Sequence, residues 1–258
     1  MVEIKTAAEL DLMRRASGIV AEVLALLKAE VRSGVSTAEL NSLAEREIRA
    51  REALPAFLGY RGYPAALCVS INEEVVHGIP DAKRIVRDGD LVSLDLGAIY
   101  RGFYGDAAIT VAVGTVGPER ARLMEVTAAS LSAALSEVRS GARLGDVSHA
   151  VEKFVTKNGM SVVREFTGHG IGRHLHEEPS IPNYGKPGTG VTLRPGMTLA
   201  IEPMVCLGSP GITVKSDGWT AVSADGSCTA HFEHTVAVTE KGCEILSVIN
   251  HGGADIFV

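Results

Sequence analysis

The sequence predicts an α+β fold built from two similar halves, each a helix pair followed by strands of one continuous sheet. Three observations predict it. Helical periodicity appears twice, near 6–50 and 118–157, and glycine-rich β-type runs follow it both times. Short motifs recur in the same order in the two halves. The 258 residues, 46% of them hydrophobic, suffice for one large domain with a substantial core.

Two capping boxes predict where the first helix pair begins. Thr6-Ala-Ala-Glu9 and Ser36-Thr-Ala-Glu39 have the spacing at which a hydroxyl and a carboxylate each accept a backbone N–H. Gly34 supplies the stop between the helices, and the second helix should end before Pro55.

The remaining elements follow from periodicity and turn residues. Within 57–115 the clearest strands are Val92–Leu96 and Ile109–Val113. Pro118 suits the first turn of a helix, and a further helix covers about 145–157. Beyond it, strands, turns and loops are again expected.

The two halves repeat individual residues. Each half first contains a His-x-x-Pro segment. An apolar-Arg-x-Gly turn follows, and the β-type run after it ends in an acidic residue. A second acidic residue then precedes the tetrapeptide Thr-Val-Ala-Val. These segments are 77–80, 86–95 and 106–113 in one half, and 176–179, 193–202 and 233–238 in the other. Three matches in order indicate pseudo-twofold halves, approximately 1–115 and 116–258, of a single domain 1–258.

Composition excludes several classes of protein. The 25 basic residues, against 31 acids, form no long block, so no DNA partner is expected. Charges or glycines interrupt every apolar run, so no membrane span is expected, and the first residues lack a secretory pattern. Four scattered cysteines argue against a disulfide framework and for a reducing, cytoplasmic location.

Four acids occupy matched positions in the two halves. Asp95 and Glu202 end apolar strands, and Asp106 and Glu233 begin the returning ones. A buried carboxylate needs a partner, and pairing with an arginine or capping a turn would explain any single acid but not the repetition. The candidate arginines are Arg87, Arg101, Arg164, Arg173 and Arg194. We therefore favour a dinuclear site in which the four carboxylates hold two divalent cations around a shared water.

A nitrogen ligand is available in the glycine-rich segment 167–172. Glycines flank His169, which would let the backbone turn tightly there. Oxygen ligands with one imidazole suit Mn, Fe or Co, and Zn can occupy similar sites. A phosphate-binding G-x-G-x-x-G loop is disfavoured because Arg173 occupies the last glycine position and no helix follows.

His77 and His176 form a second matched pair. Each is either a turn residue before a proline or a side chain that reaches the four acids, the two histidines approaching from opposite sides. In the second case the imidazoles would donate to a developing oxyanion or position a substrate carbonyl. The histidines without a comparable pattern are interpreted as solvated or packing residues: His174, His231, His234 and His251.

Nine segments together carry a resemblance to a known family. They are Gly59–Pro64, Cys68–Pro80, Ser93–Gly97, Gly102–Asp106, Gly168–Arg173, His176–Pro179, Ile201–Met204, Asp217–Thr220 and Phe232–Val236. Over essentially its whole length the chain resembles the type I methionine aminopeptidases of the short bacterial form. This resemblance implies the creatinase/prolidase-like pita-bread fold, with antiparallel strands around a central curved sheet.

The resemblance also implies the roles of individual residues. The metal ligands would be Asp95, Asp106, His169, Glu202 and Glu233, with Asp106 and Glu233 bridging two divalent ions per chain (Co, Mn, Fe or Zn). Glu202 would also take a proton from the attacking water, and His77 and His176 would contact the substrate. The methionine pocket would be formed by Tyr60, Tyr63, Cys68 and Trp219. Two positions depart from the family pattern: Phe57 stands where a cysteine is common, and Leu175 where an aromatic residue is common.

The implied activity is removal of the N-terminal methionine from nascent proteins whose second residue is small. A metal-bridging water or hydroxide would attack the first peptide bond. The implied partners are nascent chain ends beginning with Met and a small residue, and the ribosome, and the enzyme would act as a cytoplasmic monomer.

Three alternatives fit the sequence less well. Prolidases and proline-specific aminopeptidases share the fold and metal site but usually carry a large N-terminal domain. Type II methionine enzymes usually carry a late insertion, whereas here Glu202 follows His176 by only 26 positions. A binding module on the same fold would have lost metal ligands, and this chain keeps all five.

Overall fold

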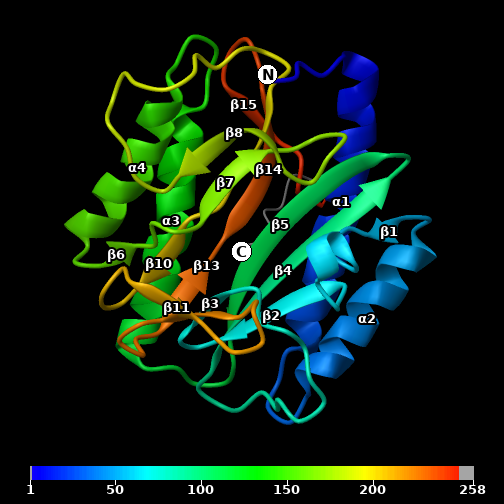
Figure 1. The fold of residues 1–258 in the computed structure, drawn as a ribbon, viewed down its shortest axis with the longest axis vertical. Coiled ribbons are helices and arrows are strands. Elements are labelled where there is room, and N and C mark those ends of the chain that lie inside the picture. The colour runs from blue at the N-terminus through cyan, green and yellow to red at the C-terminus, as the bar shows by residue number, and fades with distance from the viewer. Residues whose placement is uncertain (1, 250–258) are drawn as a thin grey trace.

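The computed structural model describes residues 2–249 (Figure 1). Its helices are α1 (Ala7–Glu30), α2 (Thr37–Ala50), α3 (Pro118–Glu137) and α4 (Leu144–Lys157), with a 3₁₀ turn at Tyr60–Gly62. The strands of the first half are β1 (Leu54–Pro55), β2 (Leu67–Ile71), β3 (Glu74–Val76), β4 (Leu91–Tyr100) and β5 (Phe103–Ala112). Those of the second half are β6 (Ser161–Val162), β7 (Thr167–Gly170), β8 (Glu177–Pro182), β9 (Thr198–Ile201), β10 (Met204–Cys206), β11 (Ile212–Val214), β12 (Ala221–Ser223), β13 (Thr229–His231), β14 (Glu233–Val238) and β15 (Cys243–Ile245).

The helix ends confirm the capping predictions. Thr6 with Glu9, and Ser36 with Glu39, each form both hydrogen bonds of a capping box at the start of α1 and α2. Gly34 follows α1 with a φ of 93°, a left-handed conformation that favours glycine. Helix α3 begins at Pro118 as predicted, and α4 begins one residue before the predicted start.

The hairpin β4–β5 is longer than predicted. Both strands have ten residues and pair antiparallel from Leu91↔Ala112 to Tyr100↔Phe103. The prediction ended the first strand early, at Leu96, and began the second late, at Ile109; the residues it left out include Gly97 and Gly105, and glycine weakens a strand pattern. In the structure these glycines admit close neighbours: a Cβ on Gly97 would lie 2.8 Å from Phe57, and one on Gly105 would lie 2.4 Å from the α1 backbone at Ser17.

The main sheet joins the two halves of the chain. Its strand order is β1-β4-β5-β14-β9-β7-β8, with β2 paired to β4 and β15 to β14. The junction is the antiparallel pair β5–β14, where Ala108 lies opposite Glu233. The hairpin of the first half therefore adjoins strands of the second half in one sheet, as the repeat predicts.

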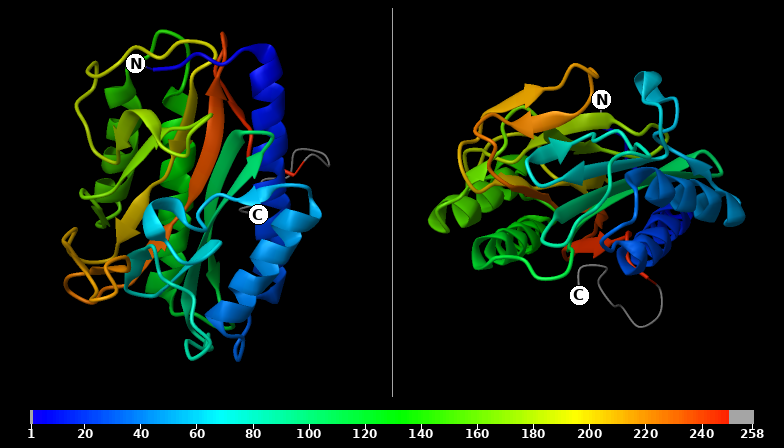
Figure 2. Two further views of the ribbon diagram at one scale, coloured as in Figure 1. Left: turned by 45° about the vertical axis from the view of Figure 1, so that its right-hand side comes forward. Right: turned by 90° about the horizontal axis from the view of Figure 1, so that it is seen from below.

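The helices cover one face of this sheet (Figure 2). Helix α1 packs on β4 and β5, while α3 packs on α4 and contacts β9, β10 and β13. The largest apolar core lies between helices and sheet and includes Leu24, Leu94 and Ile109. Within residues 2–249 no helix is long and apolar enough to cross a membrane.

Two small sheets lie beside the main one. The first has the order β11-β12-β3 and the second β13-β10-β6. The β11–β12 hairpin and β3, in orange and cyan, lie across the main sheet from the helices (Figure 2). The turn between β11 and β12 carries Trp219, whose backbone N–H donates to Asp217.

Candidate metal centre

The matched acids lie on the strands nearest the junction of the halves. Asp95 lies in the middle of β4 rather than at a strand end, because that strand runs on to Tyr100. Asp106 lies on β5, Glu202 directly follows β9, and Glu233 is the first residue of β14. All four line one cavity of about 320 Å³.

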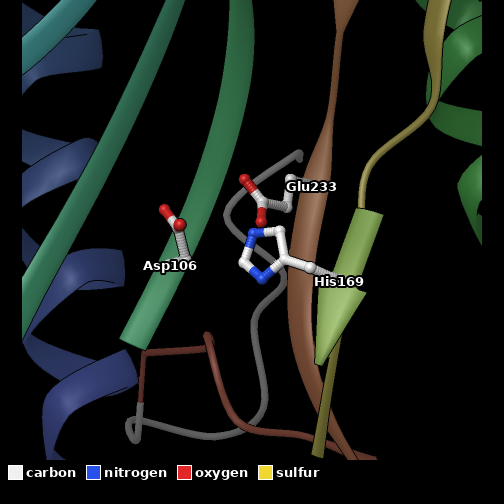
Figure 3. Close-up of side chains that lie close together, drawn as sticks. All are labelled: Asp106, His169 and Glu233. Atoms are coloured by element: carbon white, nitrogen blue, oxygen red, sulfur yellow. The ribbon is translucent and has the colours of Figure 1, made fainter. Parts of the chain in front are cut away.

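Three of the predicted ligands form a tight cluster. One ligand atom each from Asp106, His169 and Glu233 lies within 4.8 Å of the others, and all three residues are buried. Figure 3 shows that they come from three different strands, β5, β7 and β14. Glu202 extends the cluster, since its Oε1 lies 3.7 Å from His169 Nε2, and Asp95 lines the same cavity.

The glycines beside His169 have a role other than the predicted one. Gly168 and Gly170 lie in the extended strand β7, so they form no tight turn. A Cβ on Gly168 would lie 2.4 Å from the carbonyl oxygen of Ala200, and one on Gly170 would lie 2.2 Å from that of Glu178. The glycines therefore allow the neighbouring strands to approach His169 closely.

Three of the four carboxylates each have one buried oxygen without a hydrogen-bond partner. Asp95 Oδ1, Asp106 Oδ1 and Glu233 Oε1 are buried and accept no hydrogen bond among the described residues. Leaving such groups unpaired is costly, whereas a divalent cation would satisfy them. Several carboxylate oxygens and one imidazole form a donor set that fits such ions.

Arginine does not neutralise these acids. Across residues 2–249, no arginine or lysine lies within ion-pair distance of any of the four, and Arg164 and Arg173 pair with Glu152 and Glu9 instead. The alternative interpretation of the acids as arginine partners is therefore wrong.

Burial changes the pKa values of the whole cluster. It raises the pKa of Asp95 to about 7 and that of Glu202 to about 8. The pKa values of Asp106 and Glu233 rise well above their usual range because of burial and, next, because of the neighbouring carboxylates. Burial, followed by nearby His176, lowers the pKa of His169 to about 3, which keeps its ring neutral and able to bind a cation.

The matched histidines reach the same cavity from different segments. His77 has a φ of 61°, rare for a residue other than glycine, and packs edge-on against Phe166 and Trp219. His176 stacks on Tyr60, whose hydroxyl lies 2.8 Å from His176 Nδ1. The His176 ring centroid lies 4.2 Å from that of His169, so this imidazole directly adjoins the cluster.

Every pocket residue predicted from the sequence lines this cavity: Phe57, Tyr60, Tyr63, Cys68, Leu175 and Trp219. Tyr63 and Trp219 meet edge to face with centroids 5.1 Å apart. Phe57 and Leu175, which depart from the family pattern, line the cavity and are both buried in one apolar cluster with Tyr63. The cavity thus combines an acidic floor with apolar walls.

Comparison with known proteins gives the family. The profile of metallopeptidase family M24 matches residues 11–240. Methionine aminopeptidase 1 of Bacillus subtilis (strain 168) is 48% identical over 247 residues, covering 96% of this chain and 99% of that protein. The chain belongs to metallopeptidase family M24, in its methionine aminopeptidase group.

Solved structures confirm the fold. The methionine aminopeptidase of Thermotoga maritima matches with a TM-score of 0.95 at 48% identity, covering 96% of this chain and 100% of that one. An Xaa-Pro dipeptidase of Bacillus anthracis matches with a TM-score of 0.77 at 22% identity, covering 99% of this chain and 64% of that one, a likeness of fold alone. The pita-bread fold expected for a methionine aminopeptidase is therefore confirmed, and the proline-specific alternative is disfavoured.

Some residues of this methionine aminopeptidase cavity are absent from the prediction. Arg61, Glu165, Phe166 and Thr167 also line it. Phe166 contacts His77 and directly precedes the glycine-rich segment 167–172, and this position was the available signal.

His231 is a further residue near Glu202. It is 1% exposed, and its Nε2 lies 3.5 Å from Glu202 Oε2. The signal for it was its place two residues before Glu233, because alternate residues of an extended chain share a face. Of the other unassigned histidines, His174 is exposed, His234 is buried, and His251 lies outside the described residues.

Proposed function

We propose that this chain is a metal-dependent methionine aminopeptidase that removes the N-terminal methionine of nascent proteins when the second residue is small. The observation that carries this proposal is the convergence of four carboxylates, three of them with an unpaired buried oxygen, and a neutral imidazole in one cavity that is also lined by apolar residues. We assign the activity to a single domain, 1–258, acting as a cytoplasmic monomer on chains that emerge from the ribosome.

The residues that we propose would hold two divalent ions are Asp95, Asp106, His169, Glu202 and Glu233. Co, Mn, Fe and Zn all accept such donors. When bound, such ions would supply Lewis-acid chemistry, polarising a carbonyl and making water nucleophilic at neutral pH.

Glu202 carries the proton in this proposal. Its carboxylate lies beside His169, where it can accept a proton from the attacking water and deliver it to the leaving amide nitrogen. Burial raises its pKa to about 8, and a cation beside it would favour the ionised, proton-accepting form.

The two substrate histidines hold the reacting carbonyl. If the Tyr60 hydroxyl donates to His176 Nδ1, the ring proton of His176 lies on Nε2, which then donates to the carbonyl oxygen as charge develops there. Burial, followed by His231 and His176, lowers the pKa of His77 to about 4, so His77 is a neutral partner for the substrate backbone.

Specificity comes from the walls of the cavity. The aromatic and apolar residues around Tyr63 and Trp219 would bury the methionine side chain, and an apolar pocket discriminates only modestly between side chains of similar size. The second residue of the substrate would have to pass His77, His169 and His176. A side chain larger than about valine would push the scissile carbonyl off its near-attack position, and a shift of about 1 Å can cost roughly 10²-fold in rate.

Peptides of the form Met-X-Ser, with X graded from glycine to arginine, test this function. We expect kcat/KM to fall steeply once X exceeds valine, whichever of the four metals is supplied. Comparable rates for alanine, leucine and arginine at X would instead identify a broad-specificity aminopeptidase.

A further inference from the structure

An unpartnered buried imidazole adjoins the proposed proton carrier. His231 ends β13, and its Nε2 is buried without a hydrogen bond to any described residue. Buried polar groups are rarely left unpaired, so an orphaned nitrogen that faces a cavity residue calls for an explanation. The nitrogen lies 3.5 Å from Glu202 Oε2, slightly too far for a good hydrogen bond.

The backbone beneath this imidazole is held on both sides. The His231 N–H donates to Thr110 Oγ1 at 3.0 Å, and the Thr110 hydroxyl donates to the His231 carbonyl at 2.8 Å. Strand β13 also pairs with β10, placing His231 opposite Met204. Thr110 belongs to β5, the strand that carries Asp106, so His231 is fixed relative to the metal-binding residues.

Glu202 is held from several directions. Its backbone carbonyl accepts a hydrogen bond from Asn183 Nδ2 at 3.0 Å, and its Oε1 lies 3.7 Å from His169 Nε2. Its Oε2 faces His231. Its carboxylate thus lies between an imidazole proposed to bind a cation and one that does not belong to the tight ligand cluster.

We propose that His231 is the positioning residue of Glu202, donating its Nε2–H to Oε2 and so fixing the direction in which the carboxylate presents its other oxygen to the metal and the water. This inference rests on the proposed function of Glu202. The 3.5 Å separation is consistent with it, because catalytic hydrogen bonds are often long in an unliganded site and shorten in the complex. Metal-binding carboxylates are themselves commonly hydrogen-bonded by such outer residues, and losing the outer partner costs about 10- to 100-fold in metal affinity or activity.

Two substitutions separate hydrogen bonding from packing. His231→Gln keeps an N–H donor at a similar reach, whereas His231→Leu keeps apolar bulk and removes the donor. His149→Leu is the matched control, because His149 lies on α4 and contacts the Gly185 carbonyl rather than the cavity. Calorimetric titration with Mn²⁺ measures metal affinity, and hydrolysis of Met-Ala-Ser at saturating Mn²⁺ gives kcat and KM.

We expect His231→Leu to bind Mn²⁺ at least about 10-fold more weakly and to lower kcat by a similar factor, with KM changed less than about threefold. His231→Gln and His149→Leu should stay within about threefold of the parent protein. The inference is overturned if His231→Leu matches the parent in both measurements, or if His231→Gln loses as much as His231→Leu. A parent protein that cleaves Met-Ala-Ser keeps the proposed function intact in either case.

A measurement on the unsubstituted protein keeps the inference testable if His231→Leu does not fold. In the Zn²⁺-loaded protein, ¹⁵N NMR of the histidine rings distinguishes the two neutral tautomers. We expect the proton of His231 on Nε2, and finding Nε2 unprotonated would overturn the inference.

Discussion

At the scale of single residues, three histidines of the cavity differ in their position relative to the acids. His169 and His231 adjoin Glu202, and His176 stacks on Tyr60. His169 lies in the tight cluster, His231 lies behind Glu202, and His176 is exposed at the cavity. These positions predict separable effects of substitution on metal content and on turnover.

Removing the Glu202 carboxylate should abolish most activity. Glu202→Ala deletes a proposed metal ligand and the proton carrier together, so we expect kcat for Met-Ala-Ser to fall at least about 10²-fold. Metal analysis of the same protein should show weaker retention of the ions. A variant with near-normal kcat would remove Glu202 from the mechanism.

His176→Ala should behave differently. We expect a lower kcat but a metal content near that of the parent protein, because His176 adjoins His169 without belonging to the ligand cluster, and we assign it to the substrate. Elemental analysis beside steady-state kinetics makes the comparison. Loss of metal from this variant would show that the division between ligand and substrate histidines is wrong.

Patterns in the sequence could locate the acids but not their outer contacts. Asp95, Asp106, Glu202 and Glu233 stand out because two halves repeat them at matched positions. His231 has no counterpart in the other half, and its importance depends on a long-range contact with Glu202, 29 positions away along the chain.

At the scale of elements, β7 depends on the absence of side chains beside His169. Gly170→Ala would place a Cβ 2.2 Å from the Glu178 carbonyl oxygen, so β7 and β8 would have to separate. We expect destabilisation of about 1–3 kcal/mol, as for overpacking elsewhere, together with weaker metal binding as His169 moves. Urea unfolding and Mn²⁺ titration measure the two effects.

The control for that substitution is Gly18→Ala. Gly18 lies inside α1 with open space around its Cβ position, and alanine is favoured over glycine in a helix by up to about 1 kcal/mol. Equal behaviour of the two variants would show that close approach of the strands does not constrain β7.

Helices were more predictable than strands for a local reason. A capping box such as Ser36 with Glu39 is complete within four residues, so the sequence alone defines the start of α2. The length of β4 depends instead on pairing with β5 and on the packing of Phe57 over Gly97, which no local pattern records.

At the scale of the whole molecule, the metal-free protein should lose stability as the pH rises. The folded-state pKa values of Asp95 and Glu202, about 7 and 8, lie above the values of about 4 expected in the unfolded chain. These two carboxyl groups therefore bind more protons in the folded state than in the unfolded chain, and the stability that this binding contributes is lost as pH rises through 7 to 8. We expect the free energy of unfolding in chelator to fall by about 1 kcal/mol between pH 7 and 9, which lies above the range where the lowered pKa values of His77 and His169 have the opposite effect.

Denaturant unfolding at both pH values, with and without Mn²⁺, measures this effect. Bound metal should remove the loss, because cations stabilise the ionised carboxylates and bind only the folded form. Stability in chelator that is unchanged or higher at pH 9 than at pH 7 would contradict the view that the four carboxylates destabilise the fold when no metal is bound.

The junction of the halves explains why the site needs the whole chain. Strands β5 and β14 pair directly, so Asp106 from one half and Glu233 from the other become neighbours. The sequence repeat predicted that the halves resemble each other, but the pairing that joins them is set by the packed sheet.

The most direct test of the account is Met-Ala-Ser hydrolysis by protein that has been stripped with chelator and then reconstituted with Co²⁺, Mn²⁺, Fe²⁺ or Zn²⁺ in turn. We predict no activity in the stripped protein and recovery with at least one of these ions, as metal enters the site formed by Asp106, His169 and Glu233. Full activity in excess chelator, with no metal found by elemental analysis, would contradict the account.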